Sequence, residues 1–179
     1  DAAITFVSRC QNLETNDQEY VAVTDENRGG FVYFPGDSKA GEDEMDDKIA
    51  LRSYGSMGYA GLLSFIYAEM KPDDKRVVAV KEWLSKNYSI EENPGMGAQG
   101  LFYYYHTMAK ALALTAGEKI ELADGTKVKW REKLAVKLFD EQQEDGSWIN
   151  EGSSRWWEDD RVLVTSYAIL ALEHIARQL

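Results

Sequence analysis

Apolar residues gather in three long stretches of the chain that carry few charges. The stretches are residues 53–70, 96–116 and 162–176. Each contains a run of small and apolar residues, and these runs begin at Tyr59, Met108 and Tyr167, spaced 49 and then 59 residues apart. A segment that is apolar around most of its circumference and too long for a strand is typical of a helix buried on several sides. The pattern therefore predicts three buried helices in a repeated arrangement.

An amphipathic segment precedes each of these stretches. The first covers residues 2–11, and its Phe6 and Val7 are expected to face inward. The other two carry apolar residues at helical spacing, namely Val77, Val80, Leu84 and Tyr88 in one and Trp130, Leu134, Leu138 and Phe139 in the other. These two align at an offset of 56 residues, so that Phe139 corresponds to Trp83. Each segment predicts a helix with one wet face.

An amphipathic helix, a loop and a buried helix thus follow one another three times. The order predicts an all-α fold of about three helical hairpins with long loops, in a single domain over residues 1–179. Residues 118–128, around an Asp-Gly pair, predict one small β-hairpin, and residues 29–36 predict a short extended piece. The run 42–47 holds five acids in six positions. It predicts a solvated loop, because like charges repel one another.

Acidic residues mark the expected starts of two helices. Asp74 follows Pro72, and Asp159 or Asp160 precedes the last apolar stretch. A short acidic side chain accepts hydrogen bonds from the free backbone N–H groups of a first turn and suits the positive end of the helix dipole. We therefore expect helices to begin just after these residues.

The segment Gln-Gln-Glu-Asp-Gly-Ser-Trp, residues 142–148, ends the third amphipathic helix. A Gln near a helix C-terminus can tie the following loop to the helix end, and the Asp-Gly pair predicts a tight turn. Trp148 is expected to fold back as an apolar plug whose indole N–H finds a partner. Looser copies of the segment occur at Gln11 with residues 29–31, and at residues 93–97.

This segment resembles the QW repeat of squalene–hopene cyclases and the prenyltransferase/squalene oxidase repeat. Residues 167–172 are similar to the inner helix that follows the motif in that family, and residues 143–172 carry the specific part of the resemblance. The resemblance implies an α/α toroid, in which inner helices ring an axis and outer helices surround them. Three hairpins amount to half of such a ring. They imply a fragment, a homodimer that completes the ring, or an open arc.

The acid motifs of the family do not accompany the repeat. Class II cyclases protonate an alkene with Asp-x-Asp-Asp, and the nearest string here is Glu-Met-Asp-Asp at residues 44–47, which makes Asp47 the candidate acid. The diphosphate-ionising Asp-Asp-x-x-Asp is only approximated at residues 43–47. Zinc-dependent prenyl transfer needs converging ligands, whereas Cys10, His106 and His174 stand in unrelated contexts. We therefore expect neither a metal site nor a cofactor.

Aromatic residues 102–106, Phe-Tyr-Tyr-Tyr-His, supply the main candidate site. Successive helical residues turn by about 100°, so these side chains cannot all face one way. Tyr104 and Tyr105 either pack in the core with satisfied hydroxyls or line a cavity for an apolar or sugar-like ligand. His106 is the candidate acid or base with a pKa in the neutral range, although a lone His on such a helix also occurs as a structural residue.

Polysaccharide lyases that use helical toroids suggest a further set of candidates. Lyase chemistry needs a Tyr, His or Lys base and a cation that neutralises the carboxylate of the substrate. The residues that could supply these two roles are Arg52, Tyr54, Tyr104, His106 and Arg155. Trp156 and Trp157 could stack on a sugar, or pack in their loop with a cation–π contact to Arg155.

Composition and charge restrict the classes of partner that the chain can bind. The chain has 179 residues, 44% of them hydrophobic, which suits one sizeable core. Its formal net charge of −11 disfavours nucleic acid, anionic membrane surfaces and acidic polymers. A single cysteine excludes an intrachain disulfide, and no apolar run approaches the ~18 residues of a membrane span. The first residues lack signal-peptide features, so cytoplasm and processed export both remain open.

The sequence as a whole predicts a binding or scaffold module with an aromatic-lined concavity, rather than an enzyme. Its ligand is expected to be an apolar small molecule, a peptide or a glycan, bound by Tyr54, Tyr104, Tyr105, His106, Trp156 and Trp157. The alternative is an enzyme, either terpenoid cyclase-like or a toroid polysaccharide lyase, that uses His106 with nearby Tyr and Arg residues. Fold alone does not decide between them.

Overall fold

The computed structural model describes residues 2–18, 22–45 and 47–177. The described chain is mainly helical, with six α-helices and two small antiparallel hairpins. It divides into two compact units, unit 1 (residues 1–87) and unit 2 (residues 88–179). A single continuous repeat domain across both units stays a prediction.

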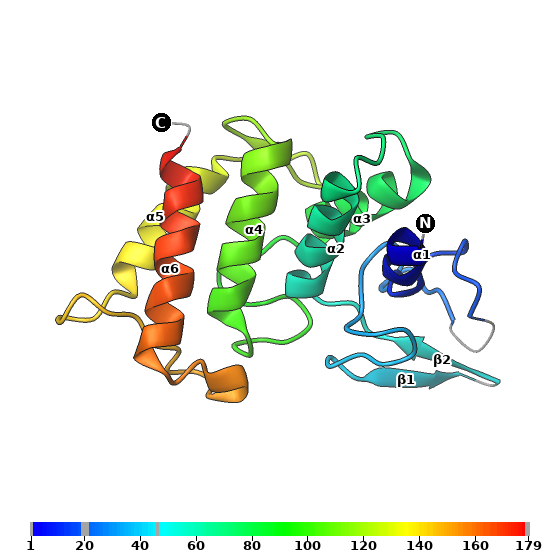
Figure 1. The fold of residues 1–179 in the computed structure, drawn as a ribbon, viewed down its shortest axis with the longest axis horizontal. Helices are drawn as coiled ribbons and strands as arrows, with labels where there is room; N and C mark the ends of the chain where they lie inside the picture. Colours follow the sequence, from blue (N-terminus) through cyan, green and yellow to red (C-terminus); the bar gives the residue numbers. More distant parts are fainter. Residues whose placement is uncertain (1, 19–21, 46, 178–179) are drawn as a thin grey trace. The chain divides into compact units, whose positions relative to one another are not determined.

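Unit 1 contains three helices and one hairpin. Its elements are α1 (Ala2–Arg9), β1 (Glu42–Met45), β2 (Lys48–Leu51), α2 (Gly55–Tyr67) and α3 (Lys75–Lys86). Helices α2 and α3 lie side by side (Figure 1). Gly58 permits this close packing, because a Cβ atom there would lie 2.9 Å from the Leu84 side chain. Asp74 begins α3 as expected, since its carboxylate accepts the backbone N–H of Arg76 at 2.9 Å.

Buried amides hold the loops of unit 1. Gln11 Nε2 donates to the carbonyl oxygens of Gly29 at 3.0 Å and of Arg76 at 2.9 Å. Asn12 Nδ2 donates to the Leu51 carbonyl at 2.8 Å. The predicted extended piece at residues 29–36 forms only isolated bridges, Gln11 with Phe31 and Phe34 with Asp37, because its backbone is tied to loops rather than to a second strand.

Two expectations for unit 1 were wrong. The acidic run does not form a loop throughout, because Glu42–Met45 is strand β1, paired antiparallel with β2. The burial of Ala50 and Leu51 in β2 anchors the hairpin, while β1 stays exposed in water and Asp43 pairs with Arg52. Phe6 is also not on an inward face, since it is exposed and meets Phe34 edge-on with ring centroids 5.6 Å apart.

Unit 2 contains two parallel helices and a third that follows the first in the sequence and runs in the opposite direction. Its elements are α4 (Leu101–Thr115), β3 (Ile120–Glu121), β4 (Lys127–Val128), α5 (Trp130–Asp140), a 3-10 turn η1 (Arg155–Trp157) and α6 (Arg161–Ala176). Helices α4 and α6 lie side by side and point the same way along the chain (Figure 1). The hairpin β3–β4 confirms the prediction at residues 118–128. Asp160 begins α6, accepting the N–H groups of Val162 and Leu163.

The bend after α5 has the predicted construction. Trp148 is buried, and its indole N–H donates to the Leu138 carbonyl at 2.7 Å, back on α5. Gln142 Nε2 donates to the Gly146 carbonyl at 2.9 Å, and Gly146 takes the positive φ of 83° that the turn requires. The Trp therefore ties the loop to the helix that precedes it.

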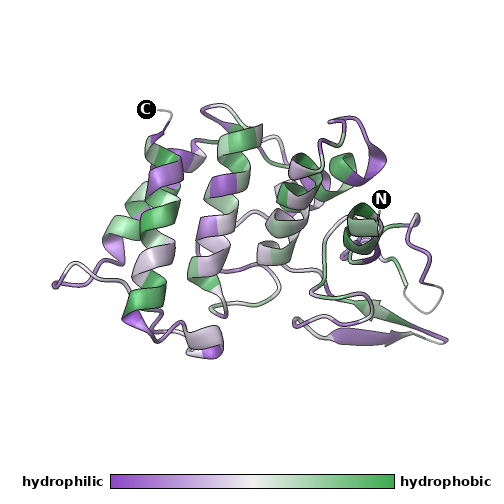
Figure 2. Ribbon diagram, viewed as in Figure 1, coloured by the Kyte–Doolittle hydropathy of each residue, from purple (hydrophilic) through white to green (hydrophobic). Residues whose placement is uncertain are grey.

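Helix α6 is not enclosed as the sequence predicts. Apolar residues occur all along it (Figure 2), and Val164, Ala168, Ala171 and Ile175 are buried. Val162 and Ile169, however, are 78% and 55% exposed. An apolar face of α6 is therefore in water.

Candidate functional site

A buried carboxylate holds the start of α4. Glu158 is 1% exposed, and one of its oxygens accepts the backbone N–H of Tyr103 at 2.9 Å. The other accepts from Asn150 Nδ2 at 2.6 Å. Burial raises the pKa of Glu158, and these hydrogen bonds oppose the rise. Glu158 therefore caps α4, because its carboxylate accepts a hydrogen bond from the first turn and lies at the positive end of the helix dipole.

Sequence reasoning missed this role of Glu158. Its only signal was a position between two tryptophans and two aspartates, which does not distinguish a buried acid from a solvated one. Because 55 residues separate Glu158 from Tyr103, the contact is visible only in the fold.

The two residues before Glu158 form a strained aromatic loop. Trp156 and Trp157 have φ values of 58° and 59°, a left-handed conformation that costs about 1–2 kcal/mol for each L-residue. Trp156 covers the helix start, where a Cβ atom on Gly100 would lie 3.0 Å from its ring. The Arg155 guanidinium lies over Trp156, 4.4 Å from the ring centroid, which matches the packing alternative for this one of the two tryptophans.

Trp157 points away from this packing. It is 76% exposed, and among the large hydrophobic side chains of the described residues only Val162 is more exposed. Its backbone is nevertheless held, because its N–H donates to the Ser154 carbonyl at 3.1 Å and its own carbonyl accepts from the Asp160 N–H at 2.9 Å. An indole is thus presented to solvent from a fixed backbone.

Tyr104 and Tyr105 are buried in unit 2 with their hydroxyls occupied. The Tyr104 hydroxyl donates to the Ser89 carbonyl and the Tyr105 hydroxyl to the Ile90 carbonyl, each at 2.7 Å. Burial raises the pKa of both phenols far above the usual value. Their arrangement matches the packing alternative, and their ligand-binding role stays a prediction.

His106 lies where α4 meets α6. Its ring stacks on Tyr167 with centroids 6.1 Å apart, and the His174 ring is 5.9 Å away. Its Nδ1 is buried and accepts or donates no hydrogen bond within the described chain. Burial, helped by His174 and Lys110, lowers the pKa of His106 to about 4. The imidazole is therefore neutral at pH 7, among aromatic rings rather than beside a carboxylate that would orient it.

Two further candidates lie in unit 1. Tyr54 is buried immediately before α2, and its N–H donates to the Phe31 carbonyl at 3.3 Å. Asp47 is exposed in the turn between β1 and β2.

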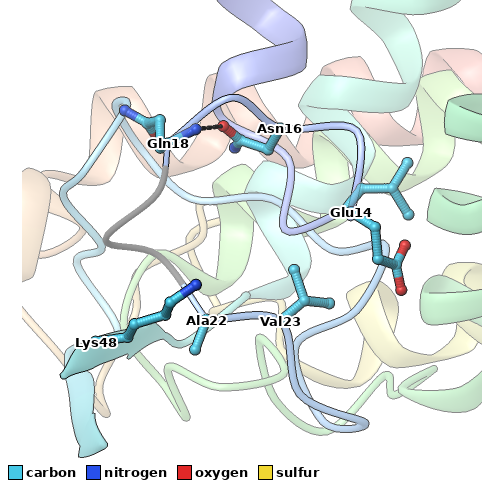
Figure 3. Close-up of a pocket in the computed structure, with 7 residues that line it drawn as sticks. Glu14, Asn16, Gln18, Ala22, Val23 and Lys48 are labelled. Carbon is cyan, nitrogen blue, oxygen red and sulfur yellow. Dashed lines mark hydrogen bonds between the residues drawn. The ribbon is translucent and has the colours of Figure 1, made fainter. Parts of the chain in front are cut away.

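A hollow of about 350 Å³ also lies in unit 1 (Figure 3). It is lined by Leu13, Glu14, Asn16, Gln18, Ala22, Val23 and Lys48. The Gln18 N–H donates to Asn16 Oδ1 at 3.0 Å on its wall. Residues 19–21, which separate Gln18 from Ala22 in the sequence, lie outside the described residues, and no site is assigned to the hollow.

Within the described residues, no three His, Cys, Asp or Glu side chains converge as metal ligands. Cys10 is buried as a small hydrophobe, and burial raises its thiol pKa to about 11. None of the described helices combines the length and apolarity that a membrane crossing needs. Comparisons of the chain with family models, curated proteins and solved structures found no match.

Proposed function

We propose that the chain is a non-catalytic repeat module, similar to the squalene cyclase and prenyltransferase repeats, that binds a basic protein segment through Trp157. The proposal has two parts. The first is that the reactive side chains serve the structure, and the second is that the exposed indole serves a partner.

The first part rests on how the polar candidates are used. The hydroxyls of Tyr104 and Tyr105 are donated to carbonyls, and Glu158 closes the start of α4. A general acid or base must reach a substrate proton and be oriented for it. These groups are instead buried and paired, which supports a scaffold role. The parallel α4 and α6 with the intervening bend at Trp148 support the resemblance to a toroid repeat.

The second part rests on one observation, the 76% exposure of Trp157 on a strained but hydrogen-bonded loop. Strain and an exposed indole both oppose stability, and such features cluster at binding sites. Trp and Arg are the residues that most often anchor protein interfaces, and Arg155 lies beside this loop. The net charge of −11 favours a partner segment rich in Lys and Arg.

A phage-displayed library of random peptides tests the binding part. We expect selection of Lys- and Arg-rich peptides whose affinity falls about tenfold or more in Trp157→Ala. Tyr33→Ala is the matched control, because Tyr33 is exposed and has Lys39 over its ring at 5.0 Å. Failure to select peptides, equal binding to both variants, or Trp157-dependent binding of a neutral polysaccharide instead would each contradict the proposal.

Incubation with squalene and with prenyl diphosphates tests the non-catalytic part. We expect no product from either substrate. Turnover that disappears in Asp47→Asn, or in His106→Phe, would replace the scaffold role with an enzymatic one.

A further inference from the structure

Aromatic and imidazole rings form a continuous row along the line where α4 and α6 meet. Tyr103 meets Tyr167 edge-on, with ring centroids 5.7 Å apart. The His106 ring stacks on Tyr167 at 6.1 Å and lies 5.9 Å from the His174 ring. Lys110 follows His106 by one turn on the same side of α4. All five residues are half-buried, and we call them the α4–α6 seam. The seam is therefore a partly exposed surface to which both helices contribute.

The two imidazoles of the α4–α6 seam are not hydrogen-bonded within the described residues, and Nδ1 of His106 is buried without a partner there. A buried N–H group that lacks an acceptor is rarer than a buried acceptor that lacks a donor. The proton of neutral His106 is therefore expected on Nε2. This N–H, together with one from His174, can be donated to a ligand.

The charges around the two imidazoles favour an anion. Helix α4 contains Lys110 and no acidic residue. The acid that acts on His174 is its neighbour Glu173, which is already paired with Arg177. Burial, followed by neighbouring positive groups that include Lys110, lowers the pKa of both imidazoles. The two tyrosines of the seam are neutral at pH 7, because burial raises their pKa. No unpaired carboxylate therefore competes with an incoming anion among these groups.

A metal ion is the other ligand that two imidazoles suggest, and the geometry disfavours it. A histidine that binds a metal through one nitrogen nearly always donates its other N–H to an acceptor. For His106 that other nitrogen is the buried Nδ1, which has no partner in the described part of the chain. The Lys110 ammonium also repels a cation. The α4–α6 seam therefore suits a negatively charged hydrogen-bond acceptor.

We propose that the α4–α6 seam binds the phosphate group of a small molecule through His106, His174 and Lys110. Two N–H donors and an ammonium match the several acceptor oxygens of a tetrahedral anion. A polyanion is disfavoured, because the net charge of −11 repels the part that would extend beyond the seam. The bound anion attracts protonated imidazoles more strongly than neutral ones. Binding of the anion and uptake of a proton therefore favour each other.

An NMR pH titration of the imidazoles tests this coupling. The chain has two histidines, so each gives its own signals, which His174→Phe assigns. Sulfate is the probe, because it resembles phosphate and stays doubly charged throughout the titration. In sodium sulfate the pKa of His106 should rise by about one unit above its value in sodium chloride of equal ionic strength. That shift corresponds to about tenfold tighter binding of sulfate to the protonated ring. An unchanged pKa would overturn the proposal.

Charge variants locate the anion. Lys110→Gln keeps a long polar side chain but removes the ammonium. It should weaken sulfate binding at pH 7, followed by the His106 signals, by about fivefold or more. Lys133→Gln is the matched control, because Lys133 is exposed on α5 and its loss changes the net charge equally. It should leave the affinity within about twofold of wild type. Equal weakening in both variants would mean that the field of the whole chain attracts the anion, which would refute the inference.

Methyl phosphate and zinc ions test the class of ligand. Methyl phosphate should also shift the His106 signals at pH 7, with the same loss of affinity in Lys110→Gln. A lack of any shift with methyl phosphate would contradict the proposal. So would zinc binding that disappears in His174→Phe and tightens in Lys110→Gln, since a cation would then occupy the α4–α6 seam. Peptide binding at Trp157, before the start of α6, is measured separately, so either proposal can fail alone.

Discussion

A carboxylate oxygen of Glu158 accepts the backbone N–H of Tyr103 at 2.9 Å across 55 residues of sequence. The contact joins the loop before α6 to the start of α4. It also explains how two tryptophans remain left-handed next to it, because Glu158 is held at both carboxylate oxygens and at its backbone carbonyl, which accepts the Asn150 N–H at 2.9 Å. The strain of the loop is offset by this buried cap.

Glu158→Ala should lower the free energy of unfolding by about 2–4 kcal/mol, because it leaves buried N–H groups unpaired and opens a small void. Glu158→Gln should cost about 1–2 kcal/mol, since one oxygen remains to accept and the new amide N–H₂ opposes Asn150. Urea denaturation followed by circular dichroism at pH 7 measures both. A cost below about 0.5 kcal/mol for Glu158→Ala would show that the cap does not hold the fold.

The pH dependence of Glu158 has a defined sign. Its folded pKa is raised, so the unfolded chain releases its proton first as pH rises above the unfolded value, and stability falls until the folded pKa is passed. Glu158→Gln removes this titration. The free energy of unfolding of the wild type should therefore fall relative to that of Glu158→Gln as the pH rises from about 4 to 7.

His106 makes the free energy of unfolding change with pH in the opposite direction. Its folded pKa is lowered to about 4 from 6.5, so acidification protonates the unfolded chain first and stability falls between those values. His106→Phe keeps a ring against Tyr167 but cannot titrate. At pH 4.5 the wild type should lose about 1–2 kcal/mol more than His106→Phe, less than the full shift implies because the ring is partly solvated. An NMR titration that finds His106 ionising near pH 6.5 would contradict this.

Trp148→Phe keeps an aromatic ring but removes the indole N–H that pairs with Leu138. It should cost about 1–3 kcal/mol, since a buried carbonyl loses its partner and the smaller ring leaves a gap. The exposed Trp157→Phe is the matched change and should stay within about 0.5 kcal/mol. Thermal and urea unfolding of both variants compares them directly, and equal costs would mean that the bend does not depend on Trp148.

Trp157→Gly should separate stability from binding. Glycine adopts the left-handed conformation freely, so this variant should be about 1 kcal/mol more stable than Trp157→Ala, which keeps the strain. Both variants should lose the peptide binding proposed for the loop. A Gly variant less stable than the Ala variant would show that the φ of 59° is not a strained conformation here.

Local physics made several elements predictable from the sequence. The apolar stretches coincide with α2, α4 and α6 to within a few residues. Asp74 and Asp160 cap the helices they precede, and an Asp-Gly pair lies in the turn between β3 and β4. In each case the deciding interactions join residues within one or two turns of each other. The resemblance to a toroid repeat also arises from such a local segment, and the ring arrangement itself stays a prediction.

The sequence alone did not decide how the two amphipathic helices α3 and α5 should be aligned, and the burial of their residues in the fold was needed. The 56-residue offset pairs Phe139 with Trp83, yet Phe139 is exposed and Trp83 is buried. An offset of 54 pairs Leu134 and Leu138 with Val80 and Leu84, all of which are buried. Both offsets bring apolar residues together in sequence, because a helical period alone does not say which side meets a neighbour.

The sequence by itself determined where helices and turns form, because those depend on neighbouring residues. Only the tertiary structure decided which polar groups are buried and hydrogen-bonded and which apolar side chains are exposed to solvent. Nothing local distinguishes Glu158 from the acids after it, or Val162 from the buried Val164. Whether each side chain is buried depends on the start of α4 and on which side of α6 packs against α4 and α5, and those contacts join residues that are far apart in the chain.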